Sequence, residues 1–255
     1  MRYIRLPLGR IQALESFTLH DGREIAQGTL GGYIDSPRNL AQTGTAWVFP
    51  GSEIRGNAYV SDSAIIEPDL ELPLPNGIVK DQARVYKYAV VKGGEVTENS
   101  RVLDRSFIGS KSLVAGEAVV FGESKILNGG KVLDAARLKG TTRKDGEQIL
   151  AELIIDGGTV KGNARVSGSP YIAGTVQDNA YISDCPAIDA TSVVMDEGRV
   201  ECCVKLINTV VDQMGIVCNT GEEDNVIEGQ TISDAGMVTN CPGRAKSKNQ
   251  CCRNV

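Results

Sequence analysis

The chain has 255 residues, a formal net charge of −5 and only 5% aromatic residues. This mild acidity gives no electrostatic reason to bind DNA, RNA or an anionic membrane, so we expect neither nucleic acid nor membrane among its partners. No apolar run approaches the roughly 20 residues that a membrane-spanning helix needs, and no secretory signal follows the first charged residues. We therefore expect a protein that is made in the cytoplasm.

Residues 1–44 carry no repeat and are expected to form a small N-terminal cap. Asp21-Gly22, after the apolar residues Phe17 and Leu19, predicts a hairpin turn. A repeat protein needs such a cover at its end, because a bare strand edge pairs with other chains.

A six-residue repeat occupies residues 45–207 and predicts the fold. Small residues recur every six positions from Ser100 to Ala136, and an aliphatic residue lies two places after each, from Val102 to Leu138. Six residues turn a helix by about 600°, so a helix loses this register, whereas a strand keeps the same face inward. The sequence predicts an all-β, single-stranded parallel β-helix, or β-solenoid, in which three short strands make one coil of about 18 residues.

Two interruptions of the repeat, at residues 67–80 and 141–157, are expected to be loop insertions. The first contains three prolines and the second a Lys-Asp-Gly turn signal. Trp47 and Phe49 flank an inward position of the first hexads, so we expect both to point outward from the coil.

The repeat degrades beyond residue 207, and residues 208–255 are expected to form an irregular, cysteine-bearing segment. Cys251 and Cys252 are neighbours in the sequence. Neighbouring cysteines rarely form a disulfide with each other because the ring that closes is strained, but they can reach another chain. The odd total of seven cysteines also leaves one thiol unpaired within a monomer. The candidates for disulfides between chains, or between tail and body, are Cys251, Cys252, Cys241 and Cys218.

Two further cysteines, Cys185 and Cys203, occupy equivalent positions of the repeat, three hexads apart. They are candidates for stacking on adjacent coils, and the alternative interpretation is that of small, partly buried residues. No C-x-x-C pair occurs, so we expect neither a zinc site nor an iron–sulfur cluster.

Three short segments resemble the GNARVSG hexad of the YdcK-like repeat proteins of bacteria and phages: residues 56–61 (GNAYVS), 162–168 (GNARVSG) and 178–183 (DNAYIS). The lead-in at residues 31–48 is similar to the opening of that family, although Tyr33 stands where the family has tryptophan. The resemblance implies a left-handed β-helix, related in architecture to the hexapeptide acyltransferases.

The chain has one histidine, His20, and it precedes the first hexad. Acyl transfer by hexapeptide enzymes uses a histidine base at a coil corner, and the related carbonic-anhydrase fold needs three histidines on zinc. We therefore expect no enzyme, no catalytic or metal-binding residue and no cofactor. The alternative is an acyltransferase in which the loops at 67–80 and 141–156 frame a site with His20.

The expected function is that of a non-enzymatic structural or attachment protein, and the expected setting is a phage virion, as a spike, fibre, collar or capsid decoration. A three-sided coil favours a homotrimer, so the expected partners are further copies and other virion proteins, and the expected location is the virion or otherwise the cytoplasm. A second alternative is a phage or bacterial binding module whose loops sequester a host factor.

Overall fold

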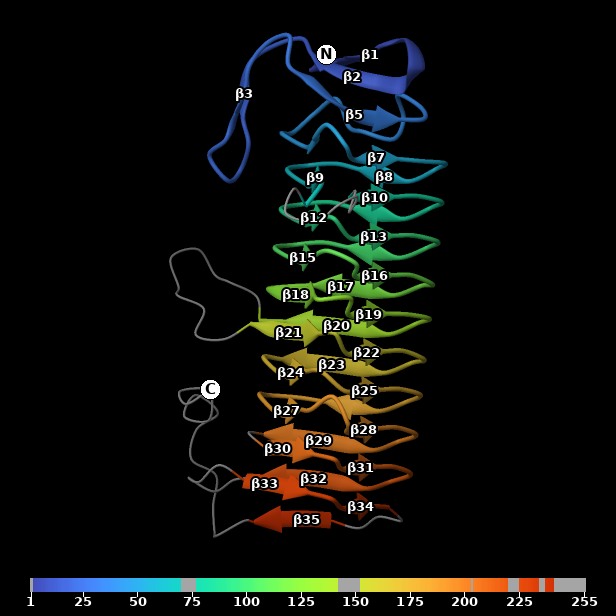
Figure 1. Cartoon of the computed structure of the whole chain (residues 1–255), viewed down its shortest axis with the longest axis vertical. Helices are drawn as coiled ribbons and strands as arrows, with labels where there is room; N and C mark the ends of the chain where they lie inside the picture. The colour runs from blue at the N-terminus through green and yellow to red at the C-terminus, as the bar shows by residue number, and fades with distance from the viewer. Residues whose placement is uncertain are drawn as a thin grey trace. The chain divides into compact units, whose positions relative to one another are not determined.

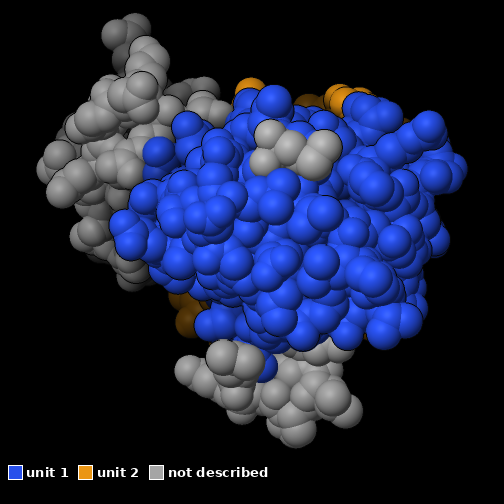
Figure 2. Space-filling view, turned by 90° about the horizontal axis from the view of Figure 1, so that it is seen from above, with its two compact units in different colours: residues 1–121, 127–129 blue, residues 122–126, 130–255 orange. Residues whose placement is uncertain are grey.

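The computed structural model describes residues 2–69, 77–141, 152–202, 204–219, 225–233 and 237–240. These residues form an all-β parallel β-solenoid of about 10 turns, which confirms the fold class that the hexads predict (Figure 1). The chain divides into two compact units: residues 1–121 with 127–129, called unit 1, and residues 122–126 with 130–255, called unit 2 (Figure 2). The left-handed sense of the coil stays a prediction from the resemblance.

In unit 1, consecutive strands are distributed over three sheets. The first sheet contains β1 (Tyr3–Arg5), β2 (Arg10–Ala13), β5 (Leu30–Ile34), β7 (Glu53–Ile54), β10 (Ile78–Val79), β13 (Glu95–Val96) and β16 (Leu113–Val114). The second contains β8 (Tyr59–Val60), β11 (Arg84–Val85), β14 (Arg101–Val102) and β17 (Val119–Phe121). The third contains β6 (Trp47–Val48), β9 (Ile65–Glu67), β12 (Val90–Lys92) and β15 (Phe107–Ile108). A 3-10 turn (Pro7–Gly9) joins β1 to β2, and β3 (Phe17–Thr18) pairs with β4 (Glu24–Ile25) as a separate hairpin.

Unit 2 distributes its strands in the same way. Its first sheet contains β19 (Lys131–Val132), β22 (Thr159–Val160), β25 (Thr175–Val176), β28 (Val193–Val194), β31 (Val210–Val211) and β34 (Thr231–Ile232). Its second contains β20 (Arg137–Gly140), β23 (Arg165–Gly168), β26 (Tyr181–Ile182), β29 (Arg199–Cys202), β32 (Ile216–Asn219) and β35 (Met237–Asn240). Its third contains β21 (Leu153–Asp156), β24 (Tyr171–Ile172), β27 (Ala187–Ile188), β30 (Val204–Ile207) and β33 (Asn225–Glu228). The strand β18 (Ser124–Leu127) contains residues of both units.

The core is built from the two inward positions of each hexad, as the repeat predicts. Val102 and Ile108 are fully buried, and so are the small residues Ser100 and Ser106 two places before them. A buried hydroxyl needs a hydrogen-bond partner. The Oγ of Ser100 donates to the Thr97 carbonyl at 2.6 Å, so a small polar residue fits beside a tight corner without an unsatisfied group.

The cap joins the coil through β5. β1 and β2 pair antiparallel and β2 pairs antiparallel with β5, but β5 then pairs in parallel with β7 of the coil. A Cβ atom on Gly32 would lie 2.3 Å from the Ser52 carbonyl oxygen, so this crossing of β5 over the first turn requires glycine. The side chain of Gln42 bonds to the outermost strand, since it accepts from the Arg2 amide at 2.9 Å and donates to the Tyr3 carbonyl at 3.2 Å. Figure 2 views unit 1 from the side of this cap.

The structure corrects the expected boundary at residue 208. β31, β32, β34 and β35 continue the parallel pairing of β28 and β29, and Val211 and Val217 are buried in the core. The inward residues here are no longer six positions apart, because Val211 follows Leu206 by five positions, and this shift hides the repeat in the sequence.

Both expected loops are shorter than the sequence suggested. β10 lies within the range 67–80 and β21 within 141–157, and each pairs with its neighbours in the coil. The remaining parts, residues 70–76 and 142–151, lie outside the described residues.

Candidate functional site

Among the described residues of unit 1, the β3–β4 hairpin leaves the coil and returns to its side (Figure 1). Its Phe17 ring meets the Trp47 ring edge-on, with ring centroids 5.7 Å apart. Val48 points into the core, so the neighbouring Trp47 belongs to the outer face, as the alternation predicts. Trp47 is nevertheless only 1% exposed, because the hairpin covers this face.

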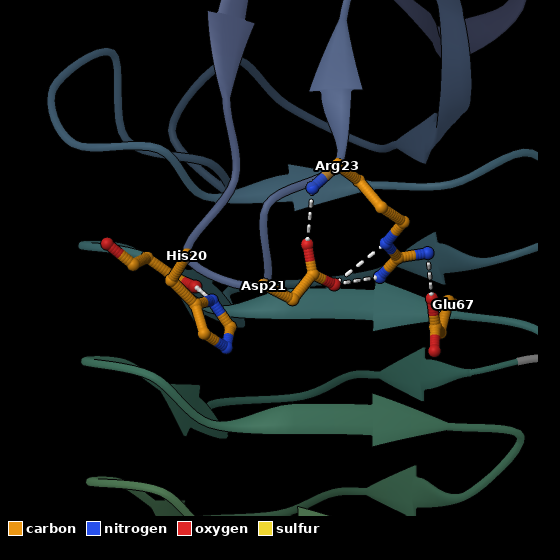
Figure 3. Close-up of polar contacts among 5 residues, drawn as sticks. His20, Asp21, Arg23 and Glu67 are labelled. Carbon is orange, nitrogen blue, oxygen red and sulfur yellow. Dashed lines mark hydrogen bonds and ion pairs between the residues drawn. The ribbon is translucent and has the colours of Figure 1, made fainter.

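Arg23 of the hairpin ties it to the coil by charge (Figure 3). Its Nε donates to Asp21 Oδ2 at 2.7 Å, and its Nη1 donates to Glu67 Oε2 at 2.7 Å. The guanidinium also lies over the Phe49 ring, 4.4 Å from the centroid. Burial disfavours the charged guanidinium and lowers its pKa. The hydrogen bonds to Asp21 and Glu67 favour the charged form more strongly, so the net effect raises the pKa of Arg23.

The same hairpin brings His20 against the coil, although the sequence places it before the first hexad. Nδ1 of His20 lies 2.8 Å from the Ser63 carbonyl oxygen (Figure 3). A carbonyl oxygen only accepts, so Nδ1 carries the proton and the neutral ring keeps its lone pair on Nε2. The imidazole meets the Tyr88 ring edge-on at 5.6 Å, and the Arg105 guanidinium lies 5.4 Å from the centre of the same ring. Hairpin and coil thus meet through His20 and Arg23.

Tyr3 anchors the cap with a buried hydroxyl. The side chain is 2% exposed, and its Oη donates to the Leu40 carbonyl at 2.6 Å. Burial raises the pKa of Tyr3 to about 12, although the hydrogen bond with Gln42 opposes this shift.

A column of acidic residues occupies the corner between the first and second sheets of unit 1, and we call it the first-corner column. Asp35 Oδ2 accepts from the Gly56 amide at 2.8 Å, Asp81 Oδ2 from the Glu98 amide at 3.2 Å, and Glu98 Oε2 from the Gly116 amide at 2.6 Å. Asp81 and Glu98 have φ values of 61° and 59°, in the left-handed region, which aspartate tolerates better than most residues other than glycine. Each carboxylate therefore bonds its own turn to the next.

Unit 2 has the same arrangement at the same corner. Asp134 Oδ2 accepts from the Gly162 amide at 2.9 Å, Asp178 Oδ2 from the Asp196 amide at 3.5 Å, and Asp196 Oδ2 from the Gln213 amide at 3.3 Å. We call this the first-corner column of unit 2. Its carboxylates hold consecutive turns together rather than meeting in one cluster.

Hydrogen bonding shifts the acidity of two corner carboxyls. The Thr97 hydroxyl donates to Asp81 and lowers the pKa of that carboxyl. At the corner between the third and first sheets of unit 2, burial opposes the charge of Asp189. The hydroxyls of Ser192 at 2.5 Å and Thr191 at 2.8 Å outweigh this effect and lower the pKa of Asp189.

Arginines form columns on the outer face of the second sheet. In unit 1 the parallel register aligns Tyr59, Arg84 and Arg101, and in unit 2 it aligns Arg137, Arg165, Tyr181 and Arg199. We call these the arginine columns of units 1 and 2. All five arginines are exposed, and none has an ion-pair partner among the described residues.

The structure locates only some of the cysteines that the sequence singled out. Cys185 is buried, and Cys218 is half-buried with its Sγ 3.7 Å from that of Cys202. The remaining candidates lie outside the described residues: Cys203, Cys241, Cys251 and Cys252. The pairing of Cys202 with Cys218 was missed because they are 16 residues apart, not the 18 of a regular coil.

The described residues contain neither a metal-ligand cluster nor a membrane-spanning helix. Within these ranges, no three side chains of His, Cys, Asp or Glu are grouped so that they could hold a metal ion. No helix in the described part of the chain has the length and apolarity to cross a membrane. The sequence also matches no protein-family model and no curated protein.

The hairpin contact is testable because Trp47 is the single tryptophan of the chain. Phe17→Ala removes the ring that covers it, so we expect red-shifted emission and steeper acrylamide quenching. Arg23→Ala should give a smaller change, since exposed ion pairs contribute about 0.2–1 kcal/mol. Phe107→Ala, on the same sheet away from the hairpin, is the matched control. Unchanged quenching in Phe17→Ala would contradict the proposed cover.

Because the buried Tyr3 hydroxyl has a raised pKa, we expect the folded protein to lose stability in alkali. Below the unfolded pKa of 10.0 both states hold the proton, and the contribution of Tyr3 is complete. Between this value and about 12 only the unfolded state loses it, so the free energy of unfolding falls by about 2–3 kcal/mol. Urea titrations from about pH 9 to 12 should show the advantage of wild type over Tyr3→Phe shrinking and then reversing. An advantage that is constant over this range would refute the assignment.

Proposed function

We propose that this chain is a non-enzymatic structural or attachment protein that works as several copies in an assembly. The observation that supports it best is the use of acidic side chains in the first-corner columns. In these columns, a carboxylate oxygen of one turn accepts a hydrogen bond from a backbone amide of the next turn of the same chain. Such bonds stiffen a repeat, because every turn depends on its neighbours for stability.

The proposed setting is a phage virion, where the chain would be a spike, fibre, collar or capsid decoration. The support is the resemblance of residues 56–61, 162–168 and 178–183 to the YdcK-like repeat proteins, together with the β-solenoid fold that this resemblance implies. Disulfides between copies through Cys241, Cys251 or Cys252 belong to the same proposal.

The arginine columns supply the proposed contact face. In unit 2, Arg137 and Arg165 lie directly opposite each other on adjacent strands, and like charges in this position destabilise a sheet. An acidic partner surface relieves this repulsion. The first-corner column of unit 2 in a second copy supplies a matching pair of carboxylates, because Asp178 and Asp196 lie one turn apart, as Arg137 and Arg165 do. The proposed state is a homo-oligomer, and the three-sided coil favours a trimer.

Native mass spectrometry of the full chain tests the assembly. We expect an oligomer that weakens roughly tenfold or more when Arg137→Glu and Arg165→Glu are combined, since like charges then face each other across the interface. Lys205→Glu makes the same change of charge at an exposed position of the third sheet and should leave the oligomer intact. A wild-type chain that is monomeric at every concentration, and absent from purified phage virions, would overturn the proposal.

A second candidate function is that of an acyltransferase, and one observation supports it. Nδ1 of His20 donates to the Ser63 carbonyl, so the lone pair of the neutral ring lies on Nε2, as a general base requires. Calorimetry with an acyl-coenzyme A distinguishes the two functions. Binding that His20→Ala abolishes would favour the enzyme, whereas no heat of binding alongside an intact oligomer would favour the structural role.

A further inference from the structure

Two thiols of unit 2 lie side by side on adjacent turns. The Sγ atoms of Cys202 and Cys218 are 3.7 Å apart, and neither sulfur is in a disulfide. β29 and β32 pair in parallel with Cys202 opposite Asn219 and Glu201 opposite Cys218, so the two cysteines are one residue out of register. A strand spacing of about 4.8 Å and a rise of about 3.3 Å per residue put their Cα atoms about 6 Å apart. Disulfides span Cα separations of roughly 4.4–6.8 Å.

The backbone at Cys202 explains why the two side chains meet. Residues one step out of register on adjacent strands normally point to opposite faces of the sheet. Cys202 ends β29 with a φ of 65°, in the left-handed region, and this conformation takes it out of the alternation. Both side chains are half-buried, so they are held by their surroundings and still reachable from solvent.

We propose that Cys202 and Cys218 form a redox-active dithiol whose substrate is a small disulfide such as glutathione disulfide. The thiolate of one cysteine attacks a sulfur of the small disulfide, forms a mixed disulfide and releases one thiol. The second cysteine, as a thiolate, then attacks the protein sulfur of the mixed disulfide. The Cys202–Cys218 bond forms, a second small thiol leaves, and the two protons of the protein thiols end on the two released thiols.

This bond would connect two turns at the C-terminal part of unit 2. β32 already pairs with β29 on one side and with β35, the last described strand, on the other. A covalent link between β29 and β32 would therefore hold together the turns that have the fewest neighbours beyond them. The side chains need only to close from 3.7 Å to the bond length of about 2.05 Å, which side-chain rotation can supply.

Peptide mapping tests the proposal on the full-length chain. Trypsin cleaves after Arg199, Lys205 and Arg244, so one peptide contains Cys202 with Cys203 and the next contains Cys218 with Cys241. In a Cys203→Ser/Cys241→Ser chain, these two peptides can be joined by one bond alone, that between Cys202 and Cys218. After native incubation with glutathione disulfide and alkylation, we expect the joined peptides, about 2 Da lighter than the sum of the two reduced peptides. Dithiothreitol should separate them.

Two controls keep the result specific. Adding Cys218→Ser to the same chain should abolish the joined peptides, and oxidation in urea should reduce their yield, because unfolding removes the 3.7 Å approach. In the wild-type chain, fragment ions should locate the same bond without the two substitutions. Separate alkylation of both cysteines, or glutathione left on both, would overturn the proposal. A bond from either one to a different cysteine would overturn it as well.

Discussion

The structure depends on one constraint: each strand is so short that it can bury only a small residue and an aliphatic residue before the chain must turn. Val102, Ile108 and their counterparts are fully buried in the interior, and the small residue Ser100 or Ser106 leaves room for the corner. No single turn can cover its own apolar face, so stability comes from stacking one turn on the next. The repeat therefore specifies an array rather than a self-sufficient unit.

The corners contribute a second layer of order. A corner residue in the left-handed region costs conformational energy unless it is glycine, aspartate or asparagine. In both units, an aspartate at the first corner, Asp81 or Asp134, tolerates this backbone and also binds an amide of the following turn. These exposed carboxylates are thus part of the hydrogen-bonding structure of the coil. The arginines of the arginine columns, in contrast, have no ion-pair partner among the described residues.

The sequence predicted the coil well and the contacts outside it poorly. The inward positions between Ser100 and Leu138 could be read from spacing, because burial imposes a period on them. The burial of Trp47 could not, since it depends on where a distant hairpin returns. The strands beyond residue 207 and the approach of Cys202 to Cys218 were hidden by shifts of register. Tertiary contacts made once leave no repeated signal.

Hydrogen exchange of single amides, followed by NMR, tests most directly whether the corner carboxylates tie the turns together. The amides of Gly116 and Gly162 sit at the solvent-facing first corner and are bound by Glu98 and Asp134. The account predicts that both exchange as slowly as strand amides, and that Glu98→Gln or Asp134→Ala speeds the amide of its own partner only. Exchange of both amides at the rate of an unfolded chain in the wild type would contradict it.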